Sequence, residues 1–317
     1  MSGTAHGRCS VANCFAPDGS CHLGSTHYSE CSKWEPIAAA DDEATAGGVS
    51  ERGHEYVPRW TGRVMGLVDL RPVVSRSSSV ILALVGAPDA GKTTLLQMLY
   101  VLLAGSGRLG SWSFAGSYTM AAWEGFATAA KFTVNGPATF PPHTTSADPR
   151  SPGFLHLALR RGSGPIRDLL VGDCPGEWFR DWTLKESHPN AAGARLIVGR
   201  ADVAVMVVDS GAIAGAERGG ARRATVDLFM RLAASQVATR TMLLWSKSDL
   251  AVPEAMEEQI ERARALHLPK AAVYRCSVTD DPAKTVLPAF LDAILDLAPR
   301  RPQSVDPAAA PDALLSL

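Results

Sequence analysis

The stretch "SVILALVGAPDAGKTTLLQMLYVLLA", residues Ser79–Ala104, contains an apolar strand, a glycine-rich turn and a helix in direct succession. Apolar and β-branched residues run over Ser79–Gly86, which predicts a buried strand. Apolar residues recur with helical spacing over Gly91–Ala104, which predicts a helix. The turn between them, "GAPDAGKT" (Gly86–Thr93), matches G-x-x-x-x-G-K-[ST]. This pattern is typical of a loop that folds around a phosphate chain, and it requires the strand and the helix that flank it here.

The residue types of this loop suit phosphates held on backbone amides at a helix N-terminus. Lys92 would reach the β- and γ-phosphates, and Thr93 would give its hydroxyl to Mg²⁺. Pro88 lacks an amide hydrogen, so Asp89 and the residues after it must supply the donors. The expected nucleotide-binding residues of the loop are Gly86, Asp89, Ala90, Gly91, Lys92, Thr93 and Thr94.

Outward from this unit, apolar strands alternate with helices. Further strands are expected at Phe154–Arg160, Asp168–Gly176, Ala201–Ser210, Thr239–Asp249 and Ala271–Val278, the first two as a hairpin. Further helices are expected at about Ala221–Gln236, Pro253–Leu266 and Thr285–Leu297. The alternation predicts an α/β fold with a mostly parallel sheet and helices on both faces. Ligands of such sheets bind at the carboxyl ends of the strands.

A second motif, "LLVGDCPGEW" (Leu169–Trp178), ends an apolar strand with Asp-x-x-Gly. Asp173 could hold Mg²⁺ through a water, and the flexible Gly176 could turn its amide to a γ-phosphate. Glu177 could orient an attacking water, or slow the reaction by repelling the γ-phosphate. An ordinary turn is the alternative interpretation of Asp-x-x-Gly.

Two polar loops after later strands could recognise a base. In "SKSD" (Ser246–Asp249), Asp249 can accept the N1–H and N2–H of guanine, which adenine does not offer, and the stem of Lys247 can pack over the base. In "CSV" (Cys276–Val278), backbone amides of Ser277 and Val278 could support guanine O6. A charged turn that merely closes a strand is the alternative interpretation of "SKSD".

A polar loop, "PPHTTSADP" (residues 141–149), precedes the hairpin. A threonine in this loop could close over Mg²⁺ and sense the γ-phosphate. Thr145 is taken as this residue, with Thr144 an equal candidate, and simple loop hydroxyls are the alternative.

The cysteines are unevenly distributed, and the cluster near the N-terminus is expected to bind a metal. Cys9, Cys14, Cys21 and Cys31 lie within the first 31 residues. Without an export signal, this clustering favours a metal over disulfides. Four thiolates suffice for a closed, structural Zn²⁺ site. His22 or His27 could replace one thiolate, and reactive or disordered cysteines are the alternative.

The motifs occur in the order of a Ras-like or Era-like P-loop GTPase, and the chain resembles that class over about Ser79–Leu297. "PDAGKT" looks like the Pro-Asn-x-Gly-Lys pattern of the Era-like branch. More narrowly, "GDCPGEWF", an aromatic-rich insert and the cysteine cluster resemble the double-GTPase family of the TRAFAC clade. Departures from the pattern are Pro88, Ser246 and Glu177.

The resemblance implies a nucleotide-dependent switch that binds GTP and hydrolyses it slowly to GDP with Mg²⁺. Lys92, Glu177 and Thr145 would act in catalysis, and Thr93, Thr145 and Asp173 would hold the metal. Double-GTPase proteins belong to multi-component bacterial systems proposed to serve in antiviral defence or conflict. A protein partner, either another GTPase or an effector of the same system, is therefore expected. A GTP-bound adaptor with little hydrolysis and, less favoured, a P-loop ATPase or kinase are the alternatives.

The domain limits follow from these segments. A cysteine-rich zinc module is expected at residues 1–35, a linker at 36–60, the GTPase domain at 61–299 and a flexible tail at 300–317. The insert, at about residues 105–142, carries many aromatic residues, which are expected to pack on the domain core more readily than to form a partner surface.

Bulk composition gives no indication of a nucleic-acid or membrane partner. The chain has 317 residues, is 46% hydrophobic and has a formal net charge of −1. It therefore shows no strong nucleic-acid signal. No apolar run approaches the roughly 20 residues of a membrane span, and the N-terminus lacks a signal-peptide pattern. A cytoplasmic location is expected.

Overall fold

A computed structural model describes residues 7–9, 31–36, 64–70, 73–74, 78–130, 153–278 and 282–299. The chain divides into two compact units, Met1–Glu55 and Tyr56–Leu317. In the first unit, β1 (Gly7–Cys9) pairs antiparallel with β2 (Trp34–Pro36). Cys9 lies opposite Trp34, whose amide donates to the carbonyl of Cys31 at 2.9 Å.

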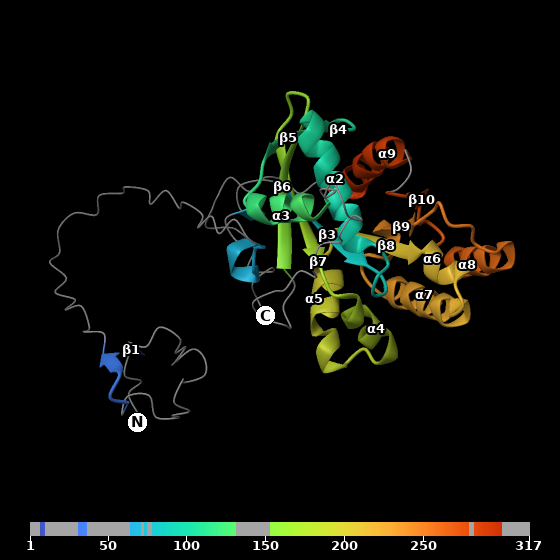
Figure 1. Ribbon diagram of the computed structural model, residues 1–317, viewed down its shortest axis with the longest axis horizontal. Coiled ribbons are helices and arrows are strands. Elements are labelled where there is room, and N and C mark those ends of the chain that lie inside the picture. The colour runs from blue at the N-terminus through green and yellow to red at the C-terminus, as the bar shows by residue number, and fades with distance from the viewer. Residues whose placement is uncertain are drawn as a thin grey trace, which may run out of the picture. The chain divides into compact units, whose positions relative to one another are not determined.

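The second unit contains one sheet with helices packed against it (Figure 1). Its strands are β3 (Ser78–Val85), β4 (Arg108–Leu109), β5 (Trp112–Gly116), β6 (Gly153–Arg161), β7 (Ile166–Asp173), β8 (Val203–Asp209), β9 (Thr241–Ser246) and β10 (Val273–Arg275). Its helices are α2 (Lys92–Ser106), α3 (Met120–Ala130), α4 (Gly176–Leu184), α5 (Ala192–Arg200), α6 (Ser210–Ala214), α7 (Arg218–Ala233), α8 (Glu254–His267) and α9 (Pro282–Leu297). Short 3-10 helices are η2 (Leu67–Leu70), η3 (Pro189–Ala191) and η4 (Ala238–Arg240).

The strand order is β10-β9-β8-β3-β7-β6-β5-β4. Pairing is parallel from β10 to β7 and antiparallel from β7 to β4. The predicted α/β fold with a mostly parallel sheet is therefore confirmed, as is the predicted hairpin, which is β6 and β7. Because β3 lies between β7 and β8, the chain order changes direction at β3, which is where open sheets of this type bind ligands.

The alternation of side chains along β3 divides the hydrophobic core into two layers. Val80, Leu82 and Leu84 pack in one layer with residues of α2 and α9. Ile81 and Val85 pack in the other with residues of α4, α5, α7 and α8. Because consecutive strand residues point to opposite faces, a continuous apolar run such as β3 needs helices on both faces.

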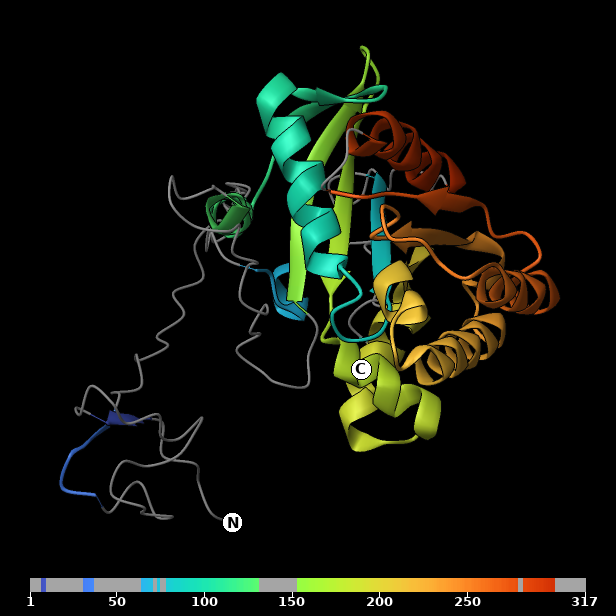
Figure 2. The same cartoon turned by 45° about the vertical axis from the view of Figure 1, so that its right-hand side comes forward.

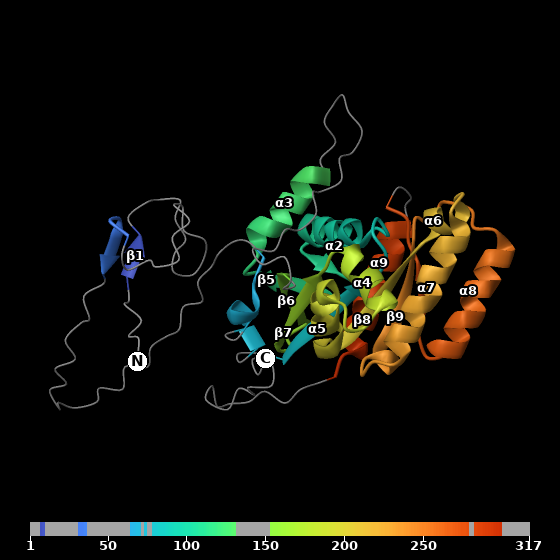
Figure 3. The same ribbon diagram turned by 90° about the horizontal axis from the view of Figure 1, so that it is seen from below.

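The aromatic insert extends the sheet and adds a helix. β4 and β5 continue the sheet beyond β6, and α3 lies alongside α2 (Figure 3). Trp123 of α3 is fully buried, and its ring stacks on that of Tyr100 with centroids 5.4 Å apart. Trp112 of β5 is also buried. The expectation that these aromatic residues pack on the core is confirmed for Trp112 and Trp123.

The predicted elements shift by a few residues at their ends. The helix expected from residue 91 to 104 is α2, and the three later helices correspond to α7, α8 and α9. Sequence patterns did not predict β4, β5, α4, α5 or α6. Among the described residues, no helix is long and apolar enough to cross a membrane.

Candidate functional site

The polar loops that follow β3, β7, β8, β9 and β10 lie at one edge of the sheet. These five strands are parallel, so their carboxyl ends face the same way. In Figure 2 the loop that joins β3 to α2 lies next to α6, which follows β8 directly. The sheet thus brings together motifs that are far apart in the sequence.

The loop between β3 and α2 is closed by Lys92. Lys92 is 7% exposed, and its Nζ donates to the carbonyl oxygens of Gly86 at 3.1 Å and Ala87 at 2.8 Å. Asp89 and Gly91 have φ values of 58° and 86°, in the left-handed region. Asp tolerates this region better than most residues, and Gly adopts it freely. The left-handed residues turn the backbone sharply, so that the loop curls ahead of the N-terminus of α2.

Burial lowers the pKa of Lys92, because a buried ammonium loses its hydration. The carboxylates of Asp173 and Glu177 act in the opposite direction and favour the charged form. Asp173, at the end of β7, is 7% exposed, whereas Glu177 is exposed on the first turn of α4. In the structure the carboxylates of Asp173 and Glu177 are therefore counter-charges for the buried ammonium of Lys92.

Gly176 lies directly on the backbone of the loop Gly86–Thr93, which is called the phosphate loop below. A Cβ atom built on Gly176 would lie 2.2 Å from the nitrogen of Pro88 and 2.5 Å from the carbonyl carbon of Ala87. Only glycine fits so close an approach. Since Gly176 is also the first residue of α4, the position of this helix is tied to the phosphate loop.

Ser246 connects the end of β9 to the phosphate loop. Its Oγ lies 2.8 Å from the carbonyl oxygen of Ala90 and 3.2 Å from that of Val208, and it donates its hydrogen between them. Ser246 is one of the departures from the GTPase pattern noted above, which has an asparagine at this position. The shorter serine still contacts the phosphate loop, through the carbonyl of Ala90.

Lys247 forms a second connection between the same two loops. Its Nζ donates to the carbonyl oxygen of Asp89 at 3.0 Å and forms an ion pair with Asp209 Oδ2 at 2.7 Å. Its backbone has a φ of 52°, which is uncommon for a non-glycine residue. The loop Ser246–Asp249, called the base loop below, is therefore fixed to the phosphate loop at two adjacent residues, Ser246 and Lys247.

The other two residues expected to contact a base lie nearby along the same edge. Asp249, two residues after Lys247, is exposed. The amide of Ser248 donates to the carbonyl of Cys276 at 3.3 Å, which joins the loop after β9 to the loop after β10. In that second loop Ser277 is buried and Val278 is exposed.

Asp209 is a site residue that sequence reasoning missed. It ends the apolar run of β8, just as Asp173 ends that of β7. The rule that drew attention to Asp173, a carboxylate at the carboxyl end of a buried strand, would have identified Asp209 as well.

Several predicted residues lie outside the described residues. They are Thr144, Thr145, Cys14, Cys21, His22 and His27. Both the threonine loop and the zinc site therefore stay predictions. In the described part of the chain, no three His, Cys, Asp or Glu side chains are grouped closely enough to hold a metal ion. Cys31 is a free cysteine.

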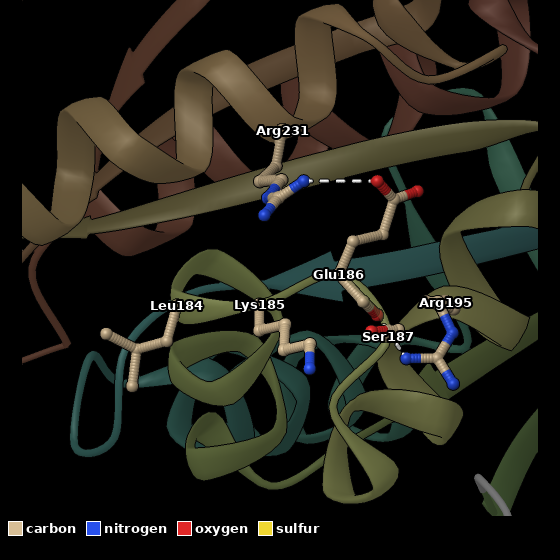
Figure 4. A pocket seen from close by; sticks show the side chains of 6 residues that line it. All are labelled: Leu184, Lys185, Glu186, Ser187, Arg195 and Arg231. Atoms are coloured by element: carbon tan, nitrogen blue, oxygen red, sulfur yellow. Dashed lines mark hydrogen bonds and ion pairs between the residues drawn. The ribbon is translucent and has the colours of Figure 1, made fainter.

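A hollow of about 670 Å³ lies at the C-terminal end of α4 (Figure 4). It is lined by Leu184, Lys185, Glu186, Ser187, Arg195 and Arg231. Its arginines are already engaged: Arg231 Nη1 bonds to Glu186 Oε2 at 3.2 Å, and Arg195 Nη1 donates to the carbonyl of His188 at 3.0 Å. We infer that these two arginines hold the C-terminal end of α4 in place. No predicted site residue lines the hollow.

The fold and the site together define a P-loop nucleotide-binding protein of the GTPase type. The model of the Double-GTPase 2 family matches residues 80–295, more than half of the chain. The chain belongs to this Double-GTPase 2 family. No match was found among curated protein sequences.

Solved structures similar to this chain include two of Era. One is Era in complex with MgGDPNP and a segment of 16S ribosomal RNA, with 16% identity, a TM-score of 0.37, and coverage of 72% of this chain and 60% of that chain. The other is a variant of Aquifex aeolicus Era bound to GDP and AlF4⁻, also at 16% identity and a TM-score of 0.37, with coverage of 71% and 59%. A protein from Thermus thermophilus has 20% identity, a TM-score of 0.31, and coverage of 61% and 22%. This chain thus spans less than two thirds of each of these proteins.

Proposed function

We propose that this chain binds GTP, hydrolyses it to GDP with Mg²⁺ and acts as a nucleotide-dependent switch. One observation carries the proposal: the base loop, which suits guanine, is hydrogen-bonded directly to the phosphate loop, which suits phosphates. Ser246 Oγ donates to the carbonyl of Ala90, and Lys247 Nζ to that of Asp89. A nucleotide that spans both loops would meet its base partners and its phosphate partners at a fixed separation.

The residues present fit a magnesium ion. Mg²⁺ prefers hard oxygen ligands and usually takes few from the protein, the rest being water and phosphate. The hydroxyl of Thr93, on the first turn of α2, and the buried carboxylate of Asp173 are such oxygens. Thr145 is the third proposed ligand. The metal would neutralise charge on the β- and γ-phosphates.

In the proposed reaction, water attacks the γ-phosphorus, the bond to the β,γ-bridging oxygen breaks, and GDP and inorganic phosphate leave. Lys92 would place its ammonium beside the β- and γ-phosphates. The amides of residues 89–94 would bind the phosphate oxygens, and the amide of Gly176 would meet the γ-phosphate. Asp249 and Lys247 would hold the guanine, with support from Ser277 and Val278.

The switch would act through α4. Gly176 packs on Ala87 and Pro88, so a change at the γ-phosphate reaches the first residue of this helix. The threonine loop around Thr145 would close over the same phosphate and open after hydrolysis.

A GTP-bound adaptor with little hydrolysis is the second candidate, and Glu177 favours it. Its carboxylate contributes to the electrostatic environment of Lys92, so it would also repel a γ-phosphate held there. Slow intrinsic turnover, raised by a partner, is the form of hydrolysis that we propose. The family's description, Double-GTPase 2, favours a second GTPase as that partner over an effector of the same system. The antiviral defence or conflict system is proposed on the sequence resemblance alone.

A Zn²⁺ site at Cys9, Cys14, Cys21 and Cys31 is also part of the proposal, as a staple for residues 1–35. The linker at residues 36–60 and the tail at 300–317 complete the proposed organisation. Metal analysis of the purified chain should give about one zinc per chain. A Cys31→Ser variant that retains all of this zinc would remove Cys31 from the ligand set.

Binding and hydrolysis are tested separately. Titration of the nucleotide-free chain with GTP and ATP tests the nucleotide. Single-turnover hydrolysis with excess protein and Mg²⁺ then tests the reaction. Tight GTP binding without any phosphate release, with or without a partner GTPase, would leave only the adaptor.

A further inference from the structure

Asp209 joins three segments at the edge of the sheet where the parallel strands have their carboxyl ends, which is called the nucleotide edge below. It is the last residue of β8, and its side chain is 10% exposed. Its Oδ1 accepts hydrogen bonds from the amides of Gly211 at 2.8 Å and Ala212 at 3.1 Å, which caps α6. Its Oδ2 lies 2.7 Å from Nζ of Lys247. One nearly buried carboxylate therefore fixes both the start of α6 and the lysine of the base loop.

Lys247 depends on this carboxylate for its position. Its Nζ otherwise donates only to the carbonyl of Asp89, at 3.0 Å, among the contacts of the described residues. Its side chain is 40% exposed, so water competes for the ammonium, and its left-handed backbone is held against a conformational cost. A charge-assisted bond to a nearly buried carboxylate is the strongest contact that holds the side chain in place.

We propose that Asp209 is a positioning residue for guanine-nucleotide binding that acts through Lys247. The inference rests on the proposed function, in which Lys247 and Asp249 hold the base. With Nζ held between Asp209 and Asp89, the stem of Lys247 is fixed and the loop that carries Asp249 starts from a defined backbone. Without Asp209 this loop must be ordered by the ligand, and that cost appears as lost affinity.

The effect should be specific to the base. The phosphate loop keeps its own closure, because Lys92 donates to Gly86 and Ala87 independently of Asp209. Loss of the Asp209–Lys247 pair should therefore weaken GDP more than ADP, whose base gains nothing from Asp249. General damage to the fold would weaken both nucleotides alike.

The variant Asp209→Asn separates the two contacts of the side chain. The amide oxygen of Asn can still accept from Gly211 and Ala212, so the cap of α6 is kept. The amide nitrogen cannot pair with the ammonium of Lys247. In the full-length chain we expect GDP affinity to fall about tenfold, a value below that of a fully buried ion pair because Lys247 is partly exposed. We expect a melting temperature close to that of the unchanged protein without nucleotide.

The matched control is Asp227→Asn on α7. Like Asp209, Asp227 faces a cationic side chain, that of Arg223 at 3.9 Å, but both side chains of this pair are more exposed, and the pair is distant in sequence from the base loop. A surface pair of this kind contributes little. GDP and ADP affinity should both stay unchanged in this variant.

A double-mutant cycle tests whether Asp209 acts through Lys247. Lys247→Gln alone should weaken GDP, and adding Asp209→Asn should weaken it no further. Unchanged GDP affinity in Asp209→Asn, or effects that add in the double variant, would overturn the inference. If the unchanged protein binds GDP and ADP equally, the proposed function fails first and the inference fails with it.

Discussion

Different kinds of contact hold the loops at the nucleotide edge of the sheet and the insert, which contains β4, β5 and α3. At the nucleotide edge, polar side chains bond to backbone carbonyls, as Lys92 and Ser246 do, and Asp89 and Lys247 adopt left-handed backbone. In the insert, buried aromatic rings such as Trp123 supply the contacts. The difference indicates that the insert contributes stability, while the nucleotide edge holds polar groups ready for a ligand.

One residue of β6, His156, accepts several of the hydrogen bonds made by the insert. The backbone oxygen of His156 accepts from Trp123 Nε1 at 2.9 Å and from Ser117 Oγ at 2.6 Å. Its ring accepts from the amide of Tyr118 at 2.9 Å through Nδ1, so the ring proton lies on Nε2, which faces Asp168 at 2.9 Å. Substitutions in the insert should mainly change stability, whereas substitutions at the nucleotide edge should mainly change nucleotide affinity.

Trp123→Ala should have the largest effect, and on stability. Removing a fully buried indole typically costs about 3–5 kcal/mol of unfolding free energy. The affinity of the remaining folded protein for GDP should change little, because no phosphate-loop contact described above involves Trp123. Urea unfolding measures the first quantity and titration with GDP the second. A selective loss of GDP affinity with unchanged stability would show that the insert serves nucleotide binding instead.

Lys92→Met should show the opposite pattern. Nucleotide affinity should fall at least about a hundredfold, because a cation that faces the phosphates is removed. Stability without nucleotide should change far less than in Trp123→Ala. The charge is no longer buried and Met fills a similar volume, which offsets the loss of the hydrogen bonds to the carbonyls of Gly86 and Ala87. Calorimetric titration and thermal unfolding of the nucleotide-free chain give the two values. A large drop in melting temperature would mean that Lys92 mainly supports the fold.

Ser246→Ala should have a smaller effect at the nucleotide edge. The carbonyls of Ala90 and Val208 lose a hydroxyl donor, at a cost of about 1–2 kcal/mol. GDP affinity should drop severalfold because the phosphate loop is less well braced. The control is Ser235→Ala, whose Oγ donates to the carbonyl of Leu232 at the end of α7. Equal GDP affinity in both variants would contradict a bracing role for Ser246.

Tyr100→Phe should have the smallest effect, and it should be visible in the titration of the tyrosines at high pH. Burial, with help from its hydrogen bond to Glu124, raises the pKa of Tyr100 to about 12. The folded state thus favours the neutral phenol, and this contribution is complete below pH 10 and lost as pH rises through about 12. In an absorbance titration, Tyr100→Phe should remove the late-titrating tyrosine. A curve that keeps this late component would show that another tyrosine has the raised pKa.

Sequence patterns predicted the parallel half of the sheet better than the insert half. β3, β7, β8 and β9 are buried on both faces, so they appear as continuous apolar runs. β4 and β5 are short, and a strand such as Trp112–Gly116 gives too few residues for its period to be recognised. The helices α4 and α5 were missed for the same reason, since each has only nine residues.

At the candidate site, residue types with a local signature could be predicted, and contacts between distant segments could not. The phosphate loop and Asp-x-x-Gly are short motifs with a known strand context. The bracing contact from Ser246 to Ala90 joins residues 156 positions apart and depends on the sheet order. The contact between Asp209 and Lys247 likewise follows from the neighbouring positions of β8 and β9, which no local pattern encodes.

Competition between GTP and ATP tests the central claim most directly, when it is performed with the unchanged chain and with Asp249→Asn. Asp249 should accept two guanine hydrogens, so the unchanged chain should prefer GTP by at least about a hundredfold. The amide of the introduced asparagine would present a donor where xanthine has an oxygen, so Asp249→Asn should lose GTP and gain xanthosine triphosphate. Equal displacement by ATP, or a nucleotide preference that Asp249→Asn leaves unchanged, would contradict guanine recognition at this site.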